Sequence, residues 1–335
     1  MYHFFSVNDV PHLPSLLRLA LEAKQWPYGQ PQLGAQKTLG LIFLNPSLRT
    51  RMSTQKAAQH LGLHTIVLNI GQEGWQLETR DGVRMDGKGV EHIREAAGVI
   101  GTYCDIVGLR SFPGLTDRAA DKAEVIFQQF MTHCRRPVMS LESATRHPLQ
   151  SLADLLTILE HSTAVWDSQR VDFVWAHRPK VVLAWAPHIK ALPQAVPNSF
   201  AEWMRVAAQS GWLDFSIAHP KGYSLDPDFV GDTPVSYDLE AGIAGADFVY
   251  IKNWSSFEDY GQCPPVKGSW MLTPDLLSAH TRQAKVMHCL PVRRNVELSE
   301  AILDGPSSLV LAQAANRVWA AQAVLSSILQ TFQRL

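Results

Sequence analysis

The stretch FLNPSLRTR, residues 43–51, joins an apolar run to a basic segment. The preceding residues 38–42 read Thr-Leu-Gly-Leu-Ile, which is typical of a buried strand, and Asn45-Pro46-Ser47 then predicts a turn that opens a helix. The first N–H groups of a helix have no intrahelical acceptor, so together with the helix dipole they favour an anion. Arg49 and Arg51 would add forked donors suited to phosphate. Spacing alone leaves open whether this segment binds an anion or is a capped helix with two solvated arginines.

The composition is that of a globular chain with room for roughly two domains. Of its 335 residues, 46% are hydrophobic and 18% are charged, which fits sizeable cores. The formal net charge of −1 gives no support for nucleic acid or an anionic membrane as a partner. The N-terminus lacks a secretory signal pattern, no apolar run is long enough to span a membrane, and the 4 cysteines form no CxxC. We therefore expect a cytoplasmic protein with reduced thiols.

Strand-like and helix-like segments alternate along the chain, which predicts an α/β protein whose parallel sheets are flanked by helices. We expect strands at residues 39–44, 65–68, 106–109, 137–140, 180–186, 215–219, 248–252 and 285–289. We expect helices at residues 53–61, 90–102, 119–132, 149–161, 198–209 and 314–332. The polar stretch 162–179 predicts a boundary between domains 1–161 and 162–313. A C-terminal helix, 314–335, is expected to pack back on the first domain.

Residues that follow the predicted strands are candidates for the site, because ligands bind at the carboxyl ends of strands in open parallel sheets. Most of them are basic or ionisable, and they predict a cleft rich in anion-binding groups: Asn45-Pro46-Ser47, Arg110-Ser111, Glu142, Pro187-His188, Lys252-Asn253-Trp254 and 288–294. Other motifs fail. Segment 82–88 has the spacing of a P-loop, but Gly89 stands where Ser or Thr is needed. No GxGxxG follows a strand, and neither HExxH nor GxSxG is present.

Three motifs, in a fixed order, resemble those of the transcarbamylase family. They are Ser47-Leu48-Arg49-Thr50-Arg51 after a strand, His147-Pro148-Leu149-Gln150 at the start of a helix, and His288-Cys289-Leu290-Pro291 at the end of a late strand. In that family the first motif binds carbamoyl phosphate, the second holds its carbonyl end, and the third lies on the substrate side. The resemblance extends over residues 40–317. It implies a two-domain carbamoyltransferase that uses neither cofactor nor metal and assembles as a homotrimer.

Within this family the chain is similar to the branch that acts on Nα-acylated ornithine. The segments that suggest it are Gly74-Trp75, 83–87, 142–147, 185–203 and 289–295. The S-M-G loop and the acidic residue with which the ornithine branch holds a free α-ammonium are not found. Aspartate transcarbamylases bring a lysine from a neighbouring subunit, and the acylornithine branch brings a tryptophan, which Trp75 matches. The branch also implies a deep knot in the second domain at residues 191–197, which otherwise read as a proline-stiffened loop.

The resemblance implies a role for each motif residue. Carbamoyl phosphate would contact Ser47, the Leu48 backbone, Arg49, Thr50, Trp75, Arg110, His147, Gln150, Cys289, Leu290 and Arg317. The catalytic residues among them would be Arg49, Thr50, Arg110, His147 and Gln150. The acylornithine would contact Val90, Glu142, His188, Lys252 and Arg293. Such a reaction needs cations and N–H donors for the charge on the carbonyl oxygen and the leaving phosphate. Purely structural interpretations remain for three residues: His147 as a helix cap, Cys289 as a small buried hydrophobe and Trp75 as a core residue.

Val90 bears on the choice of acyl group. Acetyl-specific relatives resemble this chain but have a glutamate there, and succinyl-specific ones have a small uncharged residue. A glutamate ~5 Å from the succinyl carboxylate would oppose it by about 3 kcal/mol at an effective dielectric near 20. We therefore expect N-succinyl-L-ornithine as the substrate, with N-acetyl-L-ornithine as the alternative. Glu91 weakens this expectation, because a shift of the loop by one residue would place the Glu91 carboxylate in the acyl pocket.

An alternative of a different class is a transcarbamylase-fold protein that has lost its activity and serves as a ligand sensor. Such a protein would be expected to lose the phosphate-binding arginines or the HPxQ motif. This chain keeps both. The sequence therefore favours an active enzyme.

Overall fold

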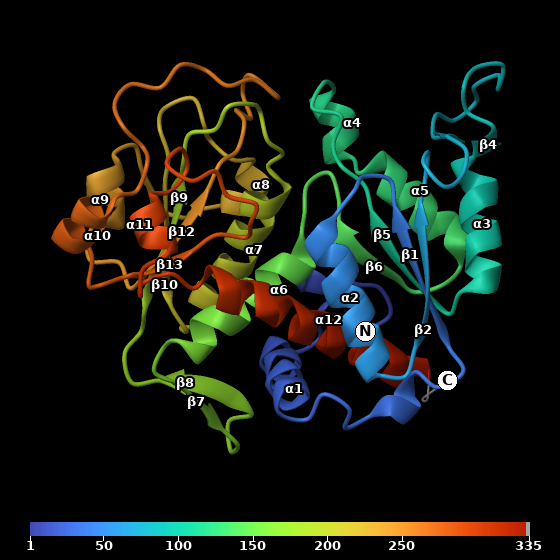
Figure 1. Ribbon diagram of the computed structural model, residues 1–335, viewed down its shortest axis with the longest axis horizontal. Helices are drawn as coiled ribbons and strands as arrows, with labels where there is room; N and C mark the ends of the chain where they lie inside the picture. The colour runs from blue at the N-terminus through green and yellow to red at the C-terminus, as the bar shows by residue number, and fades with distance from the viewer. Residues whose placement is uncertain (333–335) are drawn as a thin grey trace. The chain divides into compact units, whose positions relative to one another are not determined.

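The computed structural model describes residues 1–332 (Figure 1). The chain divides into two compact units, Met1–Leu149 with Arg317–Leu335, and Gln150–Asn316. Each unit contains a parallel sheet, so the predicted α/β class with helix-flanked parallel sheets is confirmed. The division falls within helices α6 (Pro148–Glu160) and α12 (Val310–Phe332). The domain bounds 1–161 and 162–313 stay a prediction, and residues 333–335 of the expected C-terminal helix lie outside the described part of the chain.

A four-stranded parallel sheet in the order β2-β1-β5-β6 forms the centre of the first unit. Its strands are β1 (Thr38–Phe43), β2 (His64–Asn69), β5 (Ile106–Arg110) and β6 (Val138–Glu142). Each overlaps an expected strand, because parallel strands covered on both faces need continuous apolar runs. β5 and β6 are wholly buried, whereas β2, at the edge of the sheet, is partly exposed.

Helices cover this sheet on both faces (Figure 1). They are α1 (Leu13–Gln25), α2 (Leu48–His60), α3 (Ile93–Tyr103), α5 (Val125–Cys134) and the part of α12 from Arg317, whereas the short α4 (Arg118–Lys122) has no buried residue; 3-10 turns lie at Val7–Asp9 and Pro31–Leu33. α3 and α5 share one apolar core with the sheet, which includes Ile42, Val107 and Phe127. Gly101 allows these two helices to approach closely, since a Cβ there would lie 1.9 Å from the Cys134 carbonyl oxygen.

The helix expected at residues 119–132 is instead two helices, α4 and α5, and the break has a clear physical reason. Glu124, between them, has a positive φ of 51° and is buried. Its carboxylate accepts hydrogen bonds from the Ser143 hydroxyl at 2.6 Å and the Thr145 N–H at 2.7 Å. The break thus turns Glu124 inward to hold the loop that precedes His147.

A five-stranded parallel sheet in the order β11-β10-β9-β12-β13 forms the centre of the second unit. Its strands are β9 (Lys180–Trp185), β10 (Asp214–Ala218), β11 (Val235–Ser236), β12 (Phe248–Lys252) and β13 (Lys285–Met287). The helices of this unit are α6 from Gln150 onward, α7 (Ala195–Gln209), α8 (Pro227–Val230), α9 (Leu239–Ile243), α10 (Pro274–His280), α11 (Glu300–Leu303) and the part of α12 up to Asn316. No helix within residues 1–332 has the length and apolarity needed to cross a membrane.

The structure also contains several short or amphipathic elements that the sequence pattern does not predict. The polar stretch 162–179, assigned to a domain boundary, contains an antiparallel hairpin of β7 (Ala164–Asp167) and β8 (Asp172–Trp175). The two-residue strands β3 (Leu77–Glu78) and β4 (Glu91–His92) pair in parallel. Elements this short leave no period in the sequence, and α1 lies outside the strand–helix alternation that guided the other assignments.

Candidate active site

The basic segment after β1 forms the first turn of α2. Ser47 is the N-cap residue, and its hydroxyl accepts a hydrogen bond from the Thr50 N–H at 3.3 Å. The helix therefore begins at Leu48, five residues before the expected start at 53, because the N-cap hydroxyl stabilises a first turn that apolar periodicity does not reveal. Leu48 and Arg49 thus lie in the first turn, where backbone N–H groups face out of the helix terminus. This is the anion-binding geometry that the opening motif predicts.

Three arginines from separate parts of the chain surround His147. They are Arg49 in α2, Arg110 at the end of β5 and Arg317 in α12, and the charge of each lowers the pKa of His147 after the larger effect of burial. Arg317 Nη2 also donates a hydrogen bond of 2.6 Å to the Thr50 hydroxyl, and both side chains are buried. The first unit therefore brings together five of the predicted carbamoyl phosphate residues in a strongly basic cluster.

Glu142, at the end of β6, places a carboxylate inside this cluster. Arg110 Nη1 donates a hydrogen bond to Glu142 Oε2, and His147 Nε2 lies 3.6 Å from the same oxygen. Glu142 and Arg110 are both buried. The carboxylate thus orients the Arg110 guanidinium within the anion site, in addition to the acylornithine contact that remains predicted for it.

His147 is held in its neutral form. Burial lowers its pKa well below the ordinary value, and the charges of Arg317, Arg110 and Arg49 lower it further. A neutral imidazole has one N–H donor and one acceptor nitrogen. It can therefore donate a hydrogen bond to a carbonyl oxygen as negative charge develops there, and it keeps its own proton while doing so.

This neutral histidine predicts a pH dependence of stability. Folded His147 stays unprotonated, whereas in the unfolded chain it titrates near 6.5, so the unfolded state binds more protons as the pH falls. Acidification from pH 7.5 to 5.5 should therefore lower the free energy of unfolding by about 1.4 kcal/mol through His147 alone. Urea unfolding of wild type and His147→Gln at both pH values measures this contribution. The variant should lose that part of the dependence, and identical pH dependence in the two proteins would contradict a neutral His147.

The second unit gathers a different set of predicted residues at the carboxyl ends of its strands. Arg293, in the loop after β13, donates from Nε to His188 Nε2 at 3.2 Å. The backbone N–H of Arg293 donates to Glu297 Oε2 at 2.8 Å, and Glu297 Oε1 lies 3.5 Å from His288 Nε2. Both His288 and Glu297 are buried. The loop that carries Arg293 is thus fixed to a buried acid–histidine pair.

Lys252, at the end of β12, also acts on this pair. Burial favours the neutral form of Glu297, but its interaction with His288 and the charge of Lys252 hold the Glu297 pKa below its ordinary value. An ionised Glu297 therefore balances the basic residues around it. Sequence reasoning missed Glu297, since an acidic residue in a polar loop carries no signal of burial.

Cys289 and Leu290 belong to a loop with fixed backbone contacts. The Leu290 N–H donates to His288 Nδ1 at 2.9 Å, so that nitrogen is the acceptor and Nε2 carries the proton toward Glu297. The Leu290-Pro291 peptide bond is cis. Cys289 is buried, which agrees with a contact role for it rather than a reactive one.

Gln150 lies in the first turn of α6, within the second unit. Its side chain is buried, and Nε2 donates to Asp154 Oδ1 at 2.7 Å. Asp154 stands one turn after the HPxQ motif in a mostly apolar helix, and no motif in the sequence marks it as part of the site. Among residues 1–332, no three His, Cys, Asp or Glu side chains are grouped so that they could hold a metal ion.

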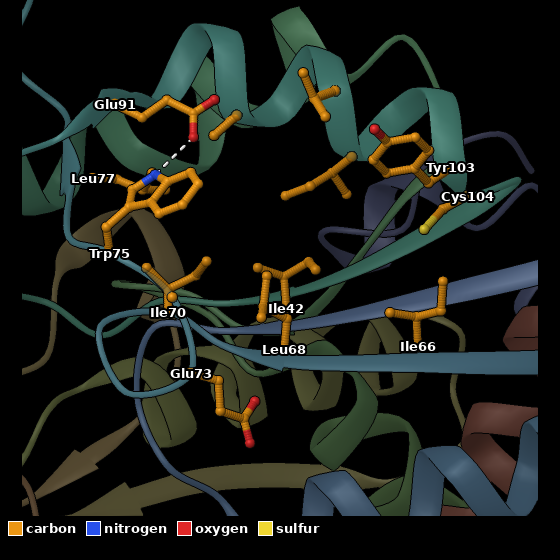
Figure 2. A pocket seen from close by; sticks show the side chains of 14 residues that line it. Ile42, Ile66, Leu68, Ile70, Glu73, Trp75, Leu77, Glu91, Tyr103 and Cys104 are labelled. Atoms are coloured by element: carbon orange, nitrogen blue, oxygen red, sulfur yellow. Dashed lines mark hydrogen bonds between the residues drawn. The ribbon is translucent and has the colours of Figure 1, made fainter.

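Trp75 and Val90 occupy the segment around β3 and β4. The Trp75 indole donates to Glu91 Oε2 at 2.8 Å and lines a pocket of about 340 Å³ with apolar side chains of β1, β2 and α3 (Figure 2). Trp75 is 55% exposed, so the interpretation as a core residue is wrong for this chain. Val90 is 67% exposed, and its N–H donates to the Gln76 carbonyl. In the described residues neither Trp75 nor Val90 hydrogen-bonds to the cluster around His147.

Two family models match the chain in its two halves. Residues 2–160 match the carbamoyl-P binding domain of aspartate/ornithine carbamoyltransferase, and residues 195–328 match its Asp/Orn binding domain. The chain belongs to the aspartate/ornithine carbamoyltransferase family and is a carbamoyltransferase, which confirms the resemblance drawn from the three motifs.

Relatives within the family sharpen this assignment. The chain is 48% identical over 332 residues to an N-succinylornithine carbamoyltransferase of Bacteroides fragilis, covering 98% of this chain and 99% of the relative. It is 32% identical over 345 residues to an N-acetylornithine carbamoyltransferase of Xanthomonas axonopodis pv. citri, covering 97% and 96%. A solved N-acetyl-L-ornithine transcarbamylase, with one glutamate mutated to valine and complexed with carbamyl phosphate and N-succinyl-L-norvaline, matches with a TM-score of 0.87 and 31% identity, covering 98% of this chain and 100% of that one.

Proposed function

We propose that this carbamoyltransferase transfers the carbamoyl group of carbamoyl phosphate to the δ-amine of N-succinyl-L-ornithine. The products are N-succinyl-L-citrulline and phosphate, a step of arginine biosynthesis, and the chemistry takes place in the cytoplasm. The observation that carries the proposal is the cluster of Arg49, Arg110 and Arg317 around a neutral His147, beside the first turn of α2. This cluster has the charge and the donors that a phosphate with an attached carbonyl requires.

In this mechanism the phosphate binds the first turn of α2 through Ser47, the Leu48 N–H, Arg49 and Thr50, within domain 1–161. The neutral δ-amine attacks the carbonyl carbon, the bond from that carbon to the phosphate oxygen breaks, and one proton of the amine passes to the leaving phosphate. Arg110 and His147 stabilise the negative charge that develops on the carbonyl oxygen, and the arginines stabilise the leaving phosphate. Gln150 holds the carbamoyl amide, so positioning of two bound substrates supplies much of the rate acceleration.

The acylornithine binds the basic residues of the second domain, 162–313. His188 and Arg293 are in contact, and Lys252 acts on the same buried Glu297 as the Arg293 loop. A basic pocket suits a substrate whose α-nitrogen is an uncharged amide and whose other groups are carboxylates, and it repels the free α-ammonium of ornithine. The threaded segment at residues 191–197 would complete a knotted domain here.

The preference for the succinyl group rests on Val90. By the resemblance drawn from the sequence, Val90 stands where acetyl-specific relatives have a glutamate, and a solved acetylornithine enzyme with one glutamate replaced by valine is complexed with N-succinyl-L-norvaline. Glu91 is the next residue along the chain, in the short strand β4, and in the single chain its carboxylate accepts the Trp75 indole N–H. The 48% identity to a succinylornithine enzyme also supports this specificity. N-acetyl-L-ornithine is the alternative acceptor.

A homotrimer with shared sites is part of the proposal. The pocket beside Trp75 is bordered by exposed apolar side chains of the edge strand β2 and of α3, among them Ile66, Val99 and Tyr103. Exposed apolar patches of this kind favour contact with another chain. We propose that Trp75 leaves Glu91 and contributes its indole to the phosphate site of an adjacent subunit.

Shared sites predict complementation between two inactive variants. Trp75→Ala and Arg49→Ala subunits, mixed and allowed to exchange, should regain up to about a quarter of the wild-type activity, because one site of each mixed trimer receives both intact residues. Activity before and after exchange measures this. Verified mixed trimers without recovery would contradict shared sites.

The proposed reaction itself is tested by a colorimetric assay for ureido product with purified protein and carbamoyl phosphate. Product should form with an acylated ornithine and be nearly absent with ornithine. A fully inactive protein would favour the ligand-sensor alternative.

A further inference from the structure

A buried carboxyl group contacts Gln150, one of the residues assigned to the carbamoyl end. Asp154, in α6, has no exposed surface, and its Oδ1 accepts two hydrogen bonds. One comes from Gln150 Nε2 at 2.7 Å and the other from Gln313 Nε2, in α12, also at 2.7 Å. Gln313 Oε1 in turn accepts the backbone N–H of His288 at 2.9 Å. Three hydrogen bonds thus connect Gln150 to the start of the loop 288–293.

The chemistry of these groups fixes the orientation of both amides. A carboxyl oxygen that accepts two hydrogen bonds selects the NH₂ side of each glutamine, because the carbonyl side would place two acceptors in contact. Gln313 is fixed twice, since its carbonyl oxygen also accepts from a backbone donor. For Gln150 the consequence is that Oε1 is the atom directed away from Asp154. Gln150 therefore presents an acceptor, which is the group that a carbamoyl NH₂ needs.

We infer that Asp154 is a positioning residue for carbamoyl transfer. It holds Gln150 with its carbonyl oxygen directed to the carbamoyl NH₂, and through Gln313 it anchors the loop 288–293 from the same carboxyl group. The inference rests on the proposed function and adds a residue that does not itself touch substrate.

A purely structural role explains this arrangement less well. Helices α6 and α12 are already joined one turn further on, where Asn316 Nδ2 donates to the Thr157 hydroxyl at 2.9 Å. Burying a carboxyl group costs stability that an apolar side chain of the same size would not. The neighbouring Tyr250 stays neutral, since its pKa is raised well above its ordinary range by burial and then by Asp154.

The test compares Asp154→Leu with Asp154→Asn in the full-length enzyme. Inorganic phosphate, as a competitive inhibitor of carbamoyl phosphate, reports on the phosphate cradle alone, whereas the substrate reports on the cradle and on the carbamoyl contacts. Asp154→Leu should lower kcat/KM for carbamoyl phosphate about tenfold or more and leave the inhibition constant of phosphate unchanged. Asp154→Asn should restore most of the rate, because its carbonyl oxygen can accept both N–H groups.

Thr157→Val is the matched control, since it alters the other bridge between α6 and α12 and should leave kcat/KM unchanged. If Asp154→Leu fails to fold, Gln313→Met tests the relay alone and should raise the KM for the acylornithine without changing phosphate inhibition. Equal weakening of phosphate and carbamoyl phosphate, or wild-type kinetics in Asp154→Leu, would overturn the positioning role. An inactive wild type would overturn the proposed function as well, so the two failures are distinguishable.

Discussion

Replacing Arg49 by alanine is expected to lower kcat/KM for carbamoyl phosphate by about a hundredfold or more while the fold stays intact. Arg49 lies in the first turn of α2 and is only partly buried, so its loss removes phosphate contacts without opening a core. Each charge-assisted hydrogen bond to phosphate is worth about 1.5–3 kcal/mol, and each 1.4 kcal/mol is tenfold in rate. Steady-state kinetics below saturation, combined with thermal unfolding, measure both parts of this expectation.

Two further variants show whether the effect is specific to the position of Arg49. Lys56→Ala removes a cation from the same helix two turns further on, and should leave the kinetics unchanged. Arg110→Ala should lose activity and also stability, by about 3–5 kcal/mol, because it strands the buried carboxylate of Glu142. Near-normal kinetics in Arg49→Ala would remove the phosphate assignment.

Replacing Val90 by glutamate is expected to invert the acceptor preference. Repulsion of the succinyl carboxylate should lower kcat/KM for N-succinyl-L-ornithine about tenfold to a hundredfold. The lower end of this range allows for the exposure of Val90, 67% in the single chain, which weakens the electrostatic effect. Activity with N-acetyl-L-ornithine should rise in the same variant.

Val90→Gln separates charge from size in this prediction, because glutamine has the shape of glutamate without its charge. It should retain most of the activity with the succinylated substrate. If glutamine and glutamate reduce that activity equally, steric exclusion rather than repulsion governs the choice of acyl group.

The sequence predicted the parts of the site that are continuous in the chain. The eight main strands could be placed because buried parallel strands are apolar runs, and the residues at their carboxyl ends followed from that placement. Asp154, Gln313 and Glu297 could not be found in this way. Each is a polar residue buried by packing with segments far along the chain, so neither periodicity nor motif spacing reveals it.

Local backbone and side-chain geometry could not be predicted from the sequence where it depends on a single residue. The break at Glu124 exists because its carboxylate holds the loop before His147, a contact between segments 19 and 21 residues apart. The hydrogen bond from Trp75 to Glu91 spans 16 residues and depends on the pairing of two very short strands. Contacts of this kind arise only once the chain has folded.

The most direct test of the central claim is a competition between acceptors. Equal concentrations of N-succinyl-L-ornithine and N-acetyl-L-ornithine are offered to the wild-type enzyme with limiting carbamoyl phosphate, and the two citrulline products are quantified by mass spectrometry. The ratio of products gives the ratio of kcat/KM values directly. We predict that N-succinyl-L-citrulline predominates strongly. A predominance of N-acetyl-L-citrulline, or the absence of either product, would contradict the account.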